Sequence, residues 1–399
     1  LYLDSRGYYH IYDDTLQAVQ GTIYISRRGD GYVRIASHDP EKDMINYMIR
    51  NGDLNGALPN DTVVIIPEAK KHHGHQFAIV EKIVKRHPFK EVYKYIDDNL
   101  LKLCWVNEDV YIKLHSGDAK GLVKGSLVLA TPEKNPLLNE AGWNIFEGTI
   151  SDVVGHIDDP ANRIRAVGLQ YGFDNKFSSK IQNIAEKLPI EVTETDLENR
   201  VDLRHEVIFT IDGADTKDID DAVSISQDGD NYILKVHIAD VSHYVKDYPA
   251  LVEEAVERGN SAYLADSVFP MFPHIISNGI CSLNEGVSRL AKTVEMTINK
   301  QGKIINAQVY KSVIRSRKQM TYDAVNQILN DGLIPLGYES YVADLKMMHK
   351  LSKIITTERK SRGSLDLDSR EYKITTDIEG KPLSITTRKQ QAGENLIEN

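Results

Sequence analysis

Residues 207–225 read Val-Ile-Phe-Thr-Ile-Asp-Gly-Ala-Asp-Thr-Lys-Asp-Ile-Asp-Asp-Ala-Val-Ser-Ile, and the second half of the chain is organised around them. Two apolar runs, Val207–Ile211 and Ala222–Ile225, bracket a loop rich in aspartate. Short runs of β-branched residues bounded by Gly and Asp are typical of strands. Gly213 allows backbone angles that a side chain would forbid, which predicts a sharp turn directly after Asp212. The sequence therefore predicts carboxylates held at the mouth of a sheet.

The aspartates of this loop are crowded enough to repel one another. They are Asp212, Asp215, Asp218, Asp220 and Asp221. At about 4 Å, each like-charge pair costs roughly 1 kcal/mol in water and roughly 4 kcal/mol near a protein surface. The repulsion is relieved if the side chains splay into solvent, if one is protonated, or if a cation binds. Oxygen ligands suit Mg²⁺, or alternatively Mn²⁺. We favour a Mg²⁺ site for phosphoryl chemistry over a solvated acidic turn.

Length and composition predict a multidomain chain. It has 399 residues, of which 41% are hydrophobic and 27% charged, so we expect two or three domains with real cores. No apolar stretch approaches the length of a membrane helix, and the N-terminus does not resemble a secretion signal. Cys104 and Cys281 are flanked by apolar residues, as expected for buried thiols in a reducing compartment. We predict a cytoplasmic monomer that does not contact a membrane.

The net charge of −10 conceals local basic clusters. Between Lys70 and Lys90, six lysines and arginines stand against one acid, Glu81. A second cluster, Lys311–Lys318, contains four lysines and arginines. Basic patches on an acidic body suit a protein that grips a phosphate backbone, although a solvated surface would explain either cluster alone.

Residues 20–172 predict two small all-β units in tandem. The glycine-led segment 56–66 has a counterpart at 121–130, and Gln-Gly-Thr-Ile at the start of the first unit has a counterpart in Glu-Gly-Thr-Ile of the second. This loose repeat predicts two five-stranded OB-type barrels, over 20–92 and 93–172. Such a pair is a nucleic-acid-binding arrangement, though fold alone does not prove the function.

Aromatic and basic residues alternate in the first barrel. The segment Gly21–Ile35 predicts strand, turn and strand. It carries Tyr24, Tyr32 and Arg34, which interleave aromatic rings with a cation. Single-stranded bases stack on such a surface. The same composition is common in edge strands, so both interpretations stay open.

The remaining segments complete the expected architecture. Residues 1–19 form a lead-in, residues 173–204 a mixed connecting segment, and residues 205–399 an α+β domain. Helices are expected at 175–188, 251–258, 321–330, 338–359 and 392–399, and a helix-capping signal stands at Thr195.

One stretch contains the residue types of a serine triad. These are His237, Asp240, Ser242 and His243. We expect all four in one near-continuous strand, 232–245, where neighbouring side chains alternate between faces. The stretch has no nucleophile-elbow motif. We therefore reject a triad.

The acidic loop closely resembles the catalytic domain of the ribonuclease II and ribonuclease R family of exoribonucleases. Asp212, Asp218, Asp220 and Asp221 match the family's motif. Further similar motifs follow in order at 238–245, 260–264, 268–271, 277–284 and 362–366. The tandem barrels are similar to that family's paired cold-shock domains. The resemblance spans nearly the whole chain, and its detail is more similar to bacterial ribonuclease R than to ribonuclease II.

The resemblance implies a Mg²⁺-dependent exoribonuclease that degrades single-stranded RNA from its 3′ end to nucleoside 5′-monophosphates. It assigns Asp212 and Asp221 to the metal, with Asp218 and Asp220 completing the acidic site. Tyr263 matches an aromatic residue that stacks on the terminal base, and Arg362 is a further candidate RNA contact.

Two departures and two rival functions accompany the resemblance. The family continues past a Gly-x-Asn-Leu-Ile-Glu helix, here residues 393–398, to an arginine-bearing segment and another barrel. We therefore interpret the chain as truncated within the catalytic domain. We also expect no counterpart here of the helical domain that often precedes the barrels in ribonuclease R. The rivals are a catalytically inactive RNA-binding relative and a DNA nuclease, which the same metal chemistry would support.

Overall fold

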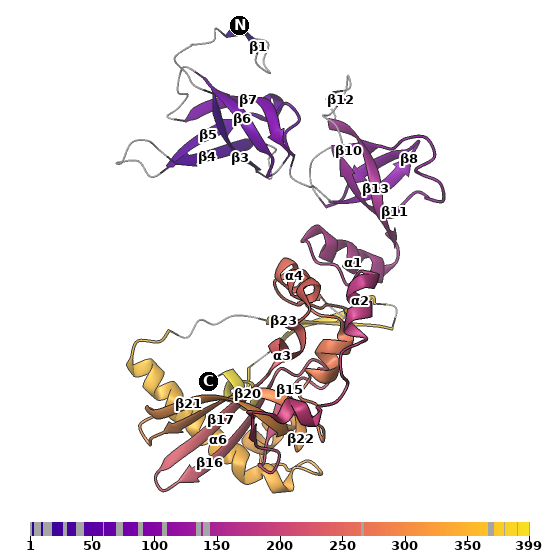
Figure 1. The fold of residues 1–399 in the computed structure, drawn as a ribbon. Coiled ribbons are helices and arrows are strands. Elements are labelled where there is room, and N and C mark those ends of the chain that lie inside the picture. The colour runs from indigo at the N-terminus through magenta and orange to yellow at the C-terminus, as the bar shows by residue number, and fades with distance from the viewer. Residues whose placement is uncertain are drawn as a thin grey trace. The chain divides into compact units, whose positions relative to one another are not determined.

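The chain divides into two compact units, Leu1–Phe173 and Asp174–Asn399. Their elements are labelled in Figure 1. The computed structural model describes residues 2–3, 9–10, 18–26, 30–36, 44–58, 60–68, 75–86, 91–105, 110–132, 137–138, 144–264, 267–365, 371–378, 380–388 and 390–398.

The first unit contains a closed five-stranded barrel with strand order β3-β4-β5-β7-β6. All its pairs are antiparallel except β5 with β7. Alternate residues of β6 are buried, so one face of each strand fills the barrel. Its core includes Ile23, Val33, Ile49, Val63 and Val80. The strands are β3 (Val19–Ile25), β4 (Gly31–Ala36), β5 (Met44–Ile49), β6 (Thr62–Pro67) and β7 (Gln76–Lys85).

A second ring in the same unit repeats this topology. Its order β8-β9-β10-β13-β11 closes through a parallel β10–β13 pair and an antiparallel β11–β8 pair. Tyr93, Leu101, Ile112 and Phe146 fill its core. The prediction of two OB-type barrels is therefore confirmed. The strands are β8 (Glu91–Asp97), β9 (Leu100–Leu103), β10 (Val110–Lys113), β11 (Ser126–Pro132), β12 (Leu137–Leu138) and β13 (Asn144–His156).

A helix that the sequence analysis missed follows the second ring. It is α1 (Pro160–Gln170), and its N-cap Asp159 accepts a hydrogen bond from the Ala161 amide. Ala166 and Leu169 on α1 pack among buried residues of the ring. An N-cap aspartate followed by proline at the first helical position is a helix-start signal, so the sequence did carry the information.

The second unit is built on a mixed seven-stranded sheet. Its four central strands are antiparallel, and β14 and β15 add parallel pairs with β21 and β22. A two-residue turn at Gly229, which has a positive φ of 56°, joins β16 to β17. In sheet order the strands are β14 (Val201–Asp202), β21 (Ile304–Arg315), β20 (Ser288–Ile298), β17 (Asn231–Ala239), β16 (Asp221–Asp228), β15 (Phe209–Asp212) and β22 (Lys318–Thr321).

Helices bury the apolar side chains of this sheet, which confirms the α+β class. Phe209, Val223 and Met320 pack against α5, α6 and α7, and Leu290 and Val313 pack against α2, α3 and α4. The helical elements are α2 (Ser179–Ala185), η2 (Glu194–Leu197), α3 (Val241–Val245), α4 (Pro249–Arg258), η3 (Ile275–Ile280), α5 (Tyr322–Asn326), η4 (Gln327–Asp331), η5 (Glu339–Tyr341), α6 (Val342–Ser361) and α7 (Ala392–Glu398).

Three local expectations need correction. The capping box lies at Thr193 with Asp196, and it starts only a short 3₁₀ turn. The segment 260–273, whose two prolines and three aromatic residues predict ordered but non-regular structure, instead forms a hairpin of β18 (Ala262–Leu264) and β19 (Ser267–Phe269). The helix expected at 321–330 ends in a π-helical turn. By contrast, the two strands that the sequence predicts near 372–376 and 383–387 form, as β23 (Glu371–Thr376) and β24 (Pro382–Arg388).

A chain of buried polar side chains crosses the sheet through His237. The His237 Nε2 lies 3.3 Å from Ser224 Oγ, and its Nδ1 lies 2.8 Å from Thr293 Oγ1. Thr293 Oγ1 lies 2.7 Å from Ser312 Oγ. His237 is fully buried, and burial together with Lys235 lowers its pKa to about 4. The histidine is therefore neutral at neutral pH, and Ser224 and Thr293 provide hydrogen-bond partners for both of its ring nitrogens.

Acid is expected to destabilise the second unit through His237. Its pKa is about 4 in the folded state and 6.5 for the free side chain. The unfolded chain thus binds a proton between these values that the folded chain does not. The contribution of His237 to the free energy of unfolding is fully present above pH 6.5. It falls by about 3 kcal/mol as the pH drops to 4. Urea unfolding at several pH values, with hydrogen exchange of the β17 amides as the probe, would measure the slope of the unfolding free energy against pH. His237→Gln should flatten the slope, and His205→Gln, at an exposed position, should not.

Candidate active site

The loop between β15 and β16 carries the four aspartates of the predicted site. Asp212 is the last residue of β15, and Asp221 is the first residue of β16. These strands pair at Phe209 and Val223, so the intervening chain spans the sheet end. Asp218 and Asp220 lie within the spanning segment, whose residues 213–220 belong to no strand. The predicted placement at the mouth of a sheet is what the fold produces.

Gly213 does not play the role that its sequence position suggested. It is absent from the positive-φ glycines, so its backbone is accessible to other residues. A Cβ there would meet only Thr216 Oγ1, at 3.2 Å. The turn is closed by the Thr216 amide, which donates to the Gly213 carbonyl at 3.1 Å. The expectation of a glycine-specific turn was wrong.

The carboxylates of the loop shift one another's ionisation. Burial and, after it, the charges of Asp221, Asp218 and Asp220 together raise the pKa of Asp212 to about 6. Burial, followed by Asp218 and Asp221, also raises the pKa of Asp220, although its side chain reaches solvent. Burial raises the pKa of Asp221. The charges of Asp218 and Asp221 therefore act on both Asp212 and Asp220, which places the four acidic groups in one electrostatic environment.

Tyr263 lies beside this acidic group. It stands on β18 with 63% of its surface exposed, and its hydroxyl donates a hydrogen bond to Asp218 Oδ2. Burial of the hydroxyl, the bond to Asp218 and the charge of Asp220 raise the Tyr263 pKa to about 12. An exposed ring tethered to an acidic loop leaves its face open to another planar group.

The carboxylate oxygens of the loop are ligands of the kind that a hard divalent cation prefers. Among the described residues, their side-chain conformations do not surround a common cation position. After burial, the charges of Asp218 and Asp221 raise the pKa of both Asp212 and Asp220, and a cation among these carboxylates would relieve that repulsion. Within the residues that the structure describes, no three His, Cys, Asp or Glu side chains lie where they would jointly hold a metal ion.

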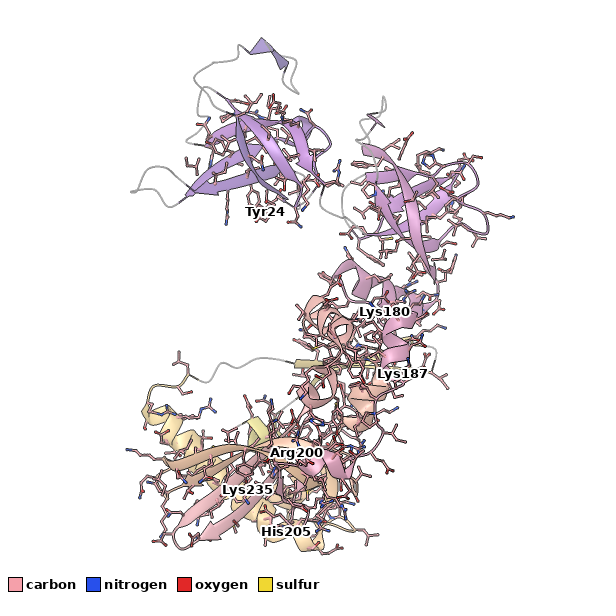
Figure 2. All side chains as sticks on the ribbon, viewed as in Figure 1. Tyr24, Lys180, Lys187, Arg200, His205 and Lys235 are labelled. Atoms are coloured by element: carbon pink, nitrogen blue, oxygen red, sulfur yellow. The ribbon has the colours of Figure 1, made fainter. Side chains whose placement is uncertain are left out.

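The other residues that were predicted to contact RNA lie on the first barrel and directly after α6. Tyr24 and Tyr32 stack on neighbouring strands of the first barrel, with ring centroids 5.4 Å apart, and Arg34 lies 5.4 Å from the Tyr32 centroid. Tyr24 is 43% exposed. Its position on the first barrel is labelled in Figure 2. Arg362 follows α6 and pairs with Glu358 at 2.9 Å.

The basic clusters are partly structural. Arg317 donates to the carbonyls of Arg204 and Glu206, and the Lys318 ammonium lies 5.5 Å from the centroid of the Tyr338 ring. Of the first cluster, Lys70, Lys71 and Lys90 lie outside the described residues.

The stretch considered for a serine triad forms an ion-pair network instead. The strand ends at Ala239 and α3 begins at Val241, so the expected continuous strand was wrong. Asp240 pairs with Arg200 at 2.7 Å and accepts a hydrogen bond from Ser242 at 2.9 Å. The His243 Nε2 lies 2.8 Å from Asp196. Ser242 therefore bonds a carboxylate, which is not the arrangement of an activated nucleophile.

Known proteins are similar to this chain over its whole length or over its second unit. The RNB domain family model matches residues 200–399. Ribonuclease R of Thermotoga maritima is 34% identical over 413 residues, which covers 100% of this chain and 55% of the relative. The chain spans about half the length of the curated relatives it matches. Among the described residues, no helix is both long and apolar enough to cross a membrane.

Solved structures share the fold over nearly the whole chain. RNase R of Mycoplasma genitalium, solved with ribose-methylated single-stranded RNA, matches with a TM-score of 0.85 and 26% identity over 95% of this chain and 59% of its own. Yeast Ssd1, described as a pseudonuclease, matches with a TM-score of 0.67 and 15% identity over 96% of this chain and 53% of its own. At 15% identity the Ssd1 match shows the fold alone.

Proposed function

This chain belongs to the RNB domain family, and we propose that it is a 3′-to-5′ exoribonuclease that hydrolyses single-stranded RNA to nucleoside 5′-monophosphates. The observation that carries this proposal is the acidic loop, where Asp212, Asp218, Asp220 and Asp221 share one electrostatic environment at a sheet end. The RNA-bound relative from Mycoplasma genitalium supports RNA as the substrate class.

The four aspartates take different parts in this proposal. Asp212 and Asp221, fixed at strand ends, would hold Mg²⁺, with Mn²⁺ as an alternative. Asp218 and Asp220 lie on the spanning segment and would complete the acidic site, where they orient the 3′ end or the attacking water. When bound, the ion would supply charge stabilisation at the scissile phosphate and a lowered pKa for water.

An inactive RNA-binding relative and a DNA nuclease are the alternatives. Fold alone does not separate them, because a pseudonuclease has the same fold. Retention of all four aspartates favours an active nuclease, since like charges in a partly buried loop are costly without a cation. Bases that stack on tyrosine rings favour a single-stranded substrate of any sequence.

Incubation of labelled single-stranded RNA and DNA with Mg²⁺ separates the three functions. Accumulation of nucleoside 5′-monophosphates from RNA alone supports the proposal. Tight RNA binding without products at any metal concentration supports the inactive relative, and products from both substrates support a nuclease without sugar selectivity. EDTA should abolish product formation if an ion is required.

Tyrosine rings would contact RNA at two separate places. Stacking contributes about 1–3 kcal/mol per base, so Tyr24→Ala should weaken binding of a long single strand by about tenfold. Tyr32 and Arg34 would extend the same platform. Tyr263→Ala should leave that affinity nearly unchanged and alter the end-product length, because Tyr263 lies beside the acidic loop. Fluorescence anisotropy and gel analysis of products would measure both. Equal effects of the two variants on affinity would contradict this division.

We also propose that the protein acts as a cytoplasmic monomer and that Arg362 contacts the RNA backbone. Arg362 has an exposed guanidinium whose known partner is Glu358 on the same helix. Surface pairs of this kind are weak, so the guanidinium is free to exchange partners.

Sedimentation analysis with and without RNA would reveal a dimer if the monomer proposal is wrong.

A further inference from the structure

One buried hydroxyl holds the backbone on both sides of Asp218. The Ser282 Oγ accepts a hydrogen bond from the Ile219 amide at 3.1 Å and donates one to the Lys217 carbonyl at 2.8 Å. Asp218 is the residue between these two groups. Ser282 has 0% of its surface exposed, so no water competes for these bonds.

Ser282 is itself held firmly. The Arg289 Nε donates to the Ser282 carbonyl at 2.8 Å, and Arg289 is buried. The adjacent Leu283 amide donates to the Ile219 carbonyl at 2.9 Å, and both side chains are buried in one apolar cluster. Ser282 is therefore a fixed point in the core beneath the acidic loop.

The loop depends on such side-chain anchors because it has no strand partner of its own. Residues 213–220 belong to no strand. Besides Ser282, the segment is tied by Gln319 Nε2 to the Thr216 carbonyl at 3.3 Å and by the amides of Leu283 and Ala239 to the carbonyls of Ile219 and Asp220, both at 2.9 Å. None of these three bonds is made by a peptide group that flanks Asp218. The other defined contact of Asp218 is the Tyr263 hydroxyl on its carboxylate.

We propose that Ser282 is a positioning residue that sets the direction of the Asp218 carboxylate in the acidic site. This inference rests on the proposed nuclease function. Without the hydroxyl, the Ile219 amide and the Lys217 carbonyl lose their shared partner, and the peptides flanking Asp218 can rotate. A misplacement of about 1 Å at a reacting centre can lower a rate about a hundredfold.

The test compares three serine variants in the full chain with Mg²⁺ and single-stranded RNA. Ser282→Ala should lower kcat by about a hundredfold and leave KM within about twofold, because Tyr24 and Tyr32 on the first barrel, to which the affinity for the strand is assigned, are untouched. Ser282→Thr keeps the hydroxyl and should recover a substantial part of kcat. Ser352→Ala is the matched control, since Ser352 is another buried serine of the second unit that donates to a carbonyl, that of Asn395. It should retain normal kcat.

A second readout does not need turnover. In metal-free protein, hydrogen exchange of the Ile219 amide should accelerate at least about tenfold in Ser282→Ala and remain slow in Ser352→Ala. Normal kcat in Ser282→Ala, or an equal loss in Ser352→Ala, would overturn the proposal. If the unaltered protein makes no product, the proposed function fails, and unchanged Ile219 exchange in Ser282→Ala would separately remove Ser282 from its positioning role.

Discussion

Asp220→Asn is expected to lower the rate of RNA hydrolysis by at least about a thousandfold and to leave RNA affinity within about twofold. A positioned ion contributes several kcal/mol to transition-state stabilisation, and each 1.36 kcal/mol corresponds to a factor of ten in rate. Asparagine keeps the shape of aspartate but removes the charge that orients a cation or water. Binding should survive because the tyrosine rings that stack on bases are unaffected.

The same substitution should not weaken the fold. The charges of Asp218 and Asp221 raise the pKa of Asp220, so its carboxylate is repelled by its neighbours when no cation is present. Removing that charge relieves the repulsion, and the melting temperature of the metal-free protein should stay the same or rise. Asp215→Asn is the matched control, because Asp215 is an exposed aspartate of the same loop outside the family motif. Substantial hydrolysis by Asp220→Asn, or equal loss in Asp215→Asn, would remove Asp220 from the mechanism.

The sequence predicted those parts of the site that are local in the chain. The aspartates lie in ten consecutive residues between two β-branched runs, so their clustering follows from one loop and two strands. The barrels were predictable for a related reason, because period-two burial and repeated glycine-led segments leave a regular pattern. The family resemblance then added roles that spacing alone could not assign.

The supports of the site were not predictable because they are distant in sequence. Ser282 lies 63 residues from Ile219, and Gln319 lies 103 residues from Thr216. A serine within a recognised motif gives no signal of which backbone atoms its hydroxyl will bind. The missed helix α3 is different, since Val241, Tyr244 and Val245 have helical spacing, and the apolar run was wrongly extended as a strand.

The Arg200–Asp240 pair is expected to contribute strongly to the stability of the second unit. Both side chains are 2% exposed, and they lie 2.7 Å apart. Arg200 also donates to the carbonyls of Ala291 on β20 and Ser312 on β21, so it ties the segment that directly precedes β14 to these two strands. Burial alone would raise the pKa of Asp240, but hydrogen bonds from Arg200 and Ser242 lower it below its ordinary value. The carboxylate therefore stays charged in the core.

Asp240→Ala should lower the free energy of unfolding by about 3–5 kcal/mol, because it leaves the Arg200 guanidinium buried without its counter-charge. Asp202→Ala is the matched control. Asp202 forms a pair of similar length with Arg204, 2.6 Å, but with side chains 52% and 31% exposed, so its loss should cost less than about 1 kcal/mol. Urea unfolding, with hydrogen exchange of the β20 and β21 amides as the probe, would measure the loss of unfolding free energy in both variants. Replacing the pair by Arg200→Met with Asp240→Leu should recover much of the loss, since a buried ion pair is costly to desolvate. Equal costs for Asp240→Ala and Asp202→Ala would show that burial does not set the strength of this pair.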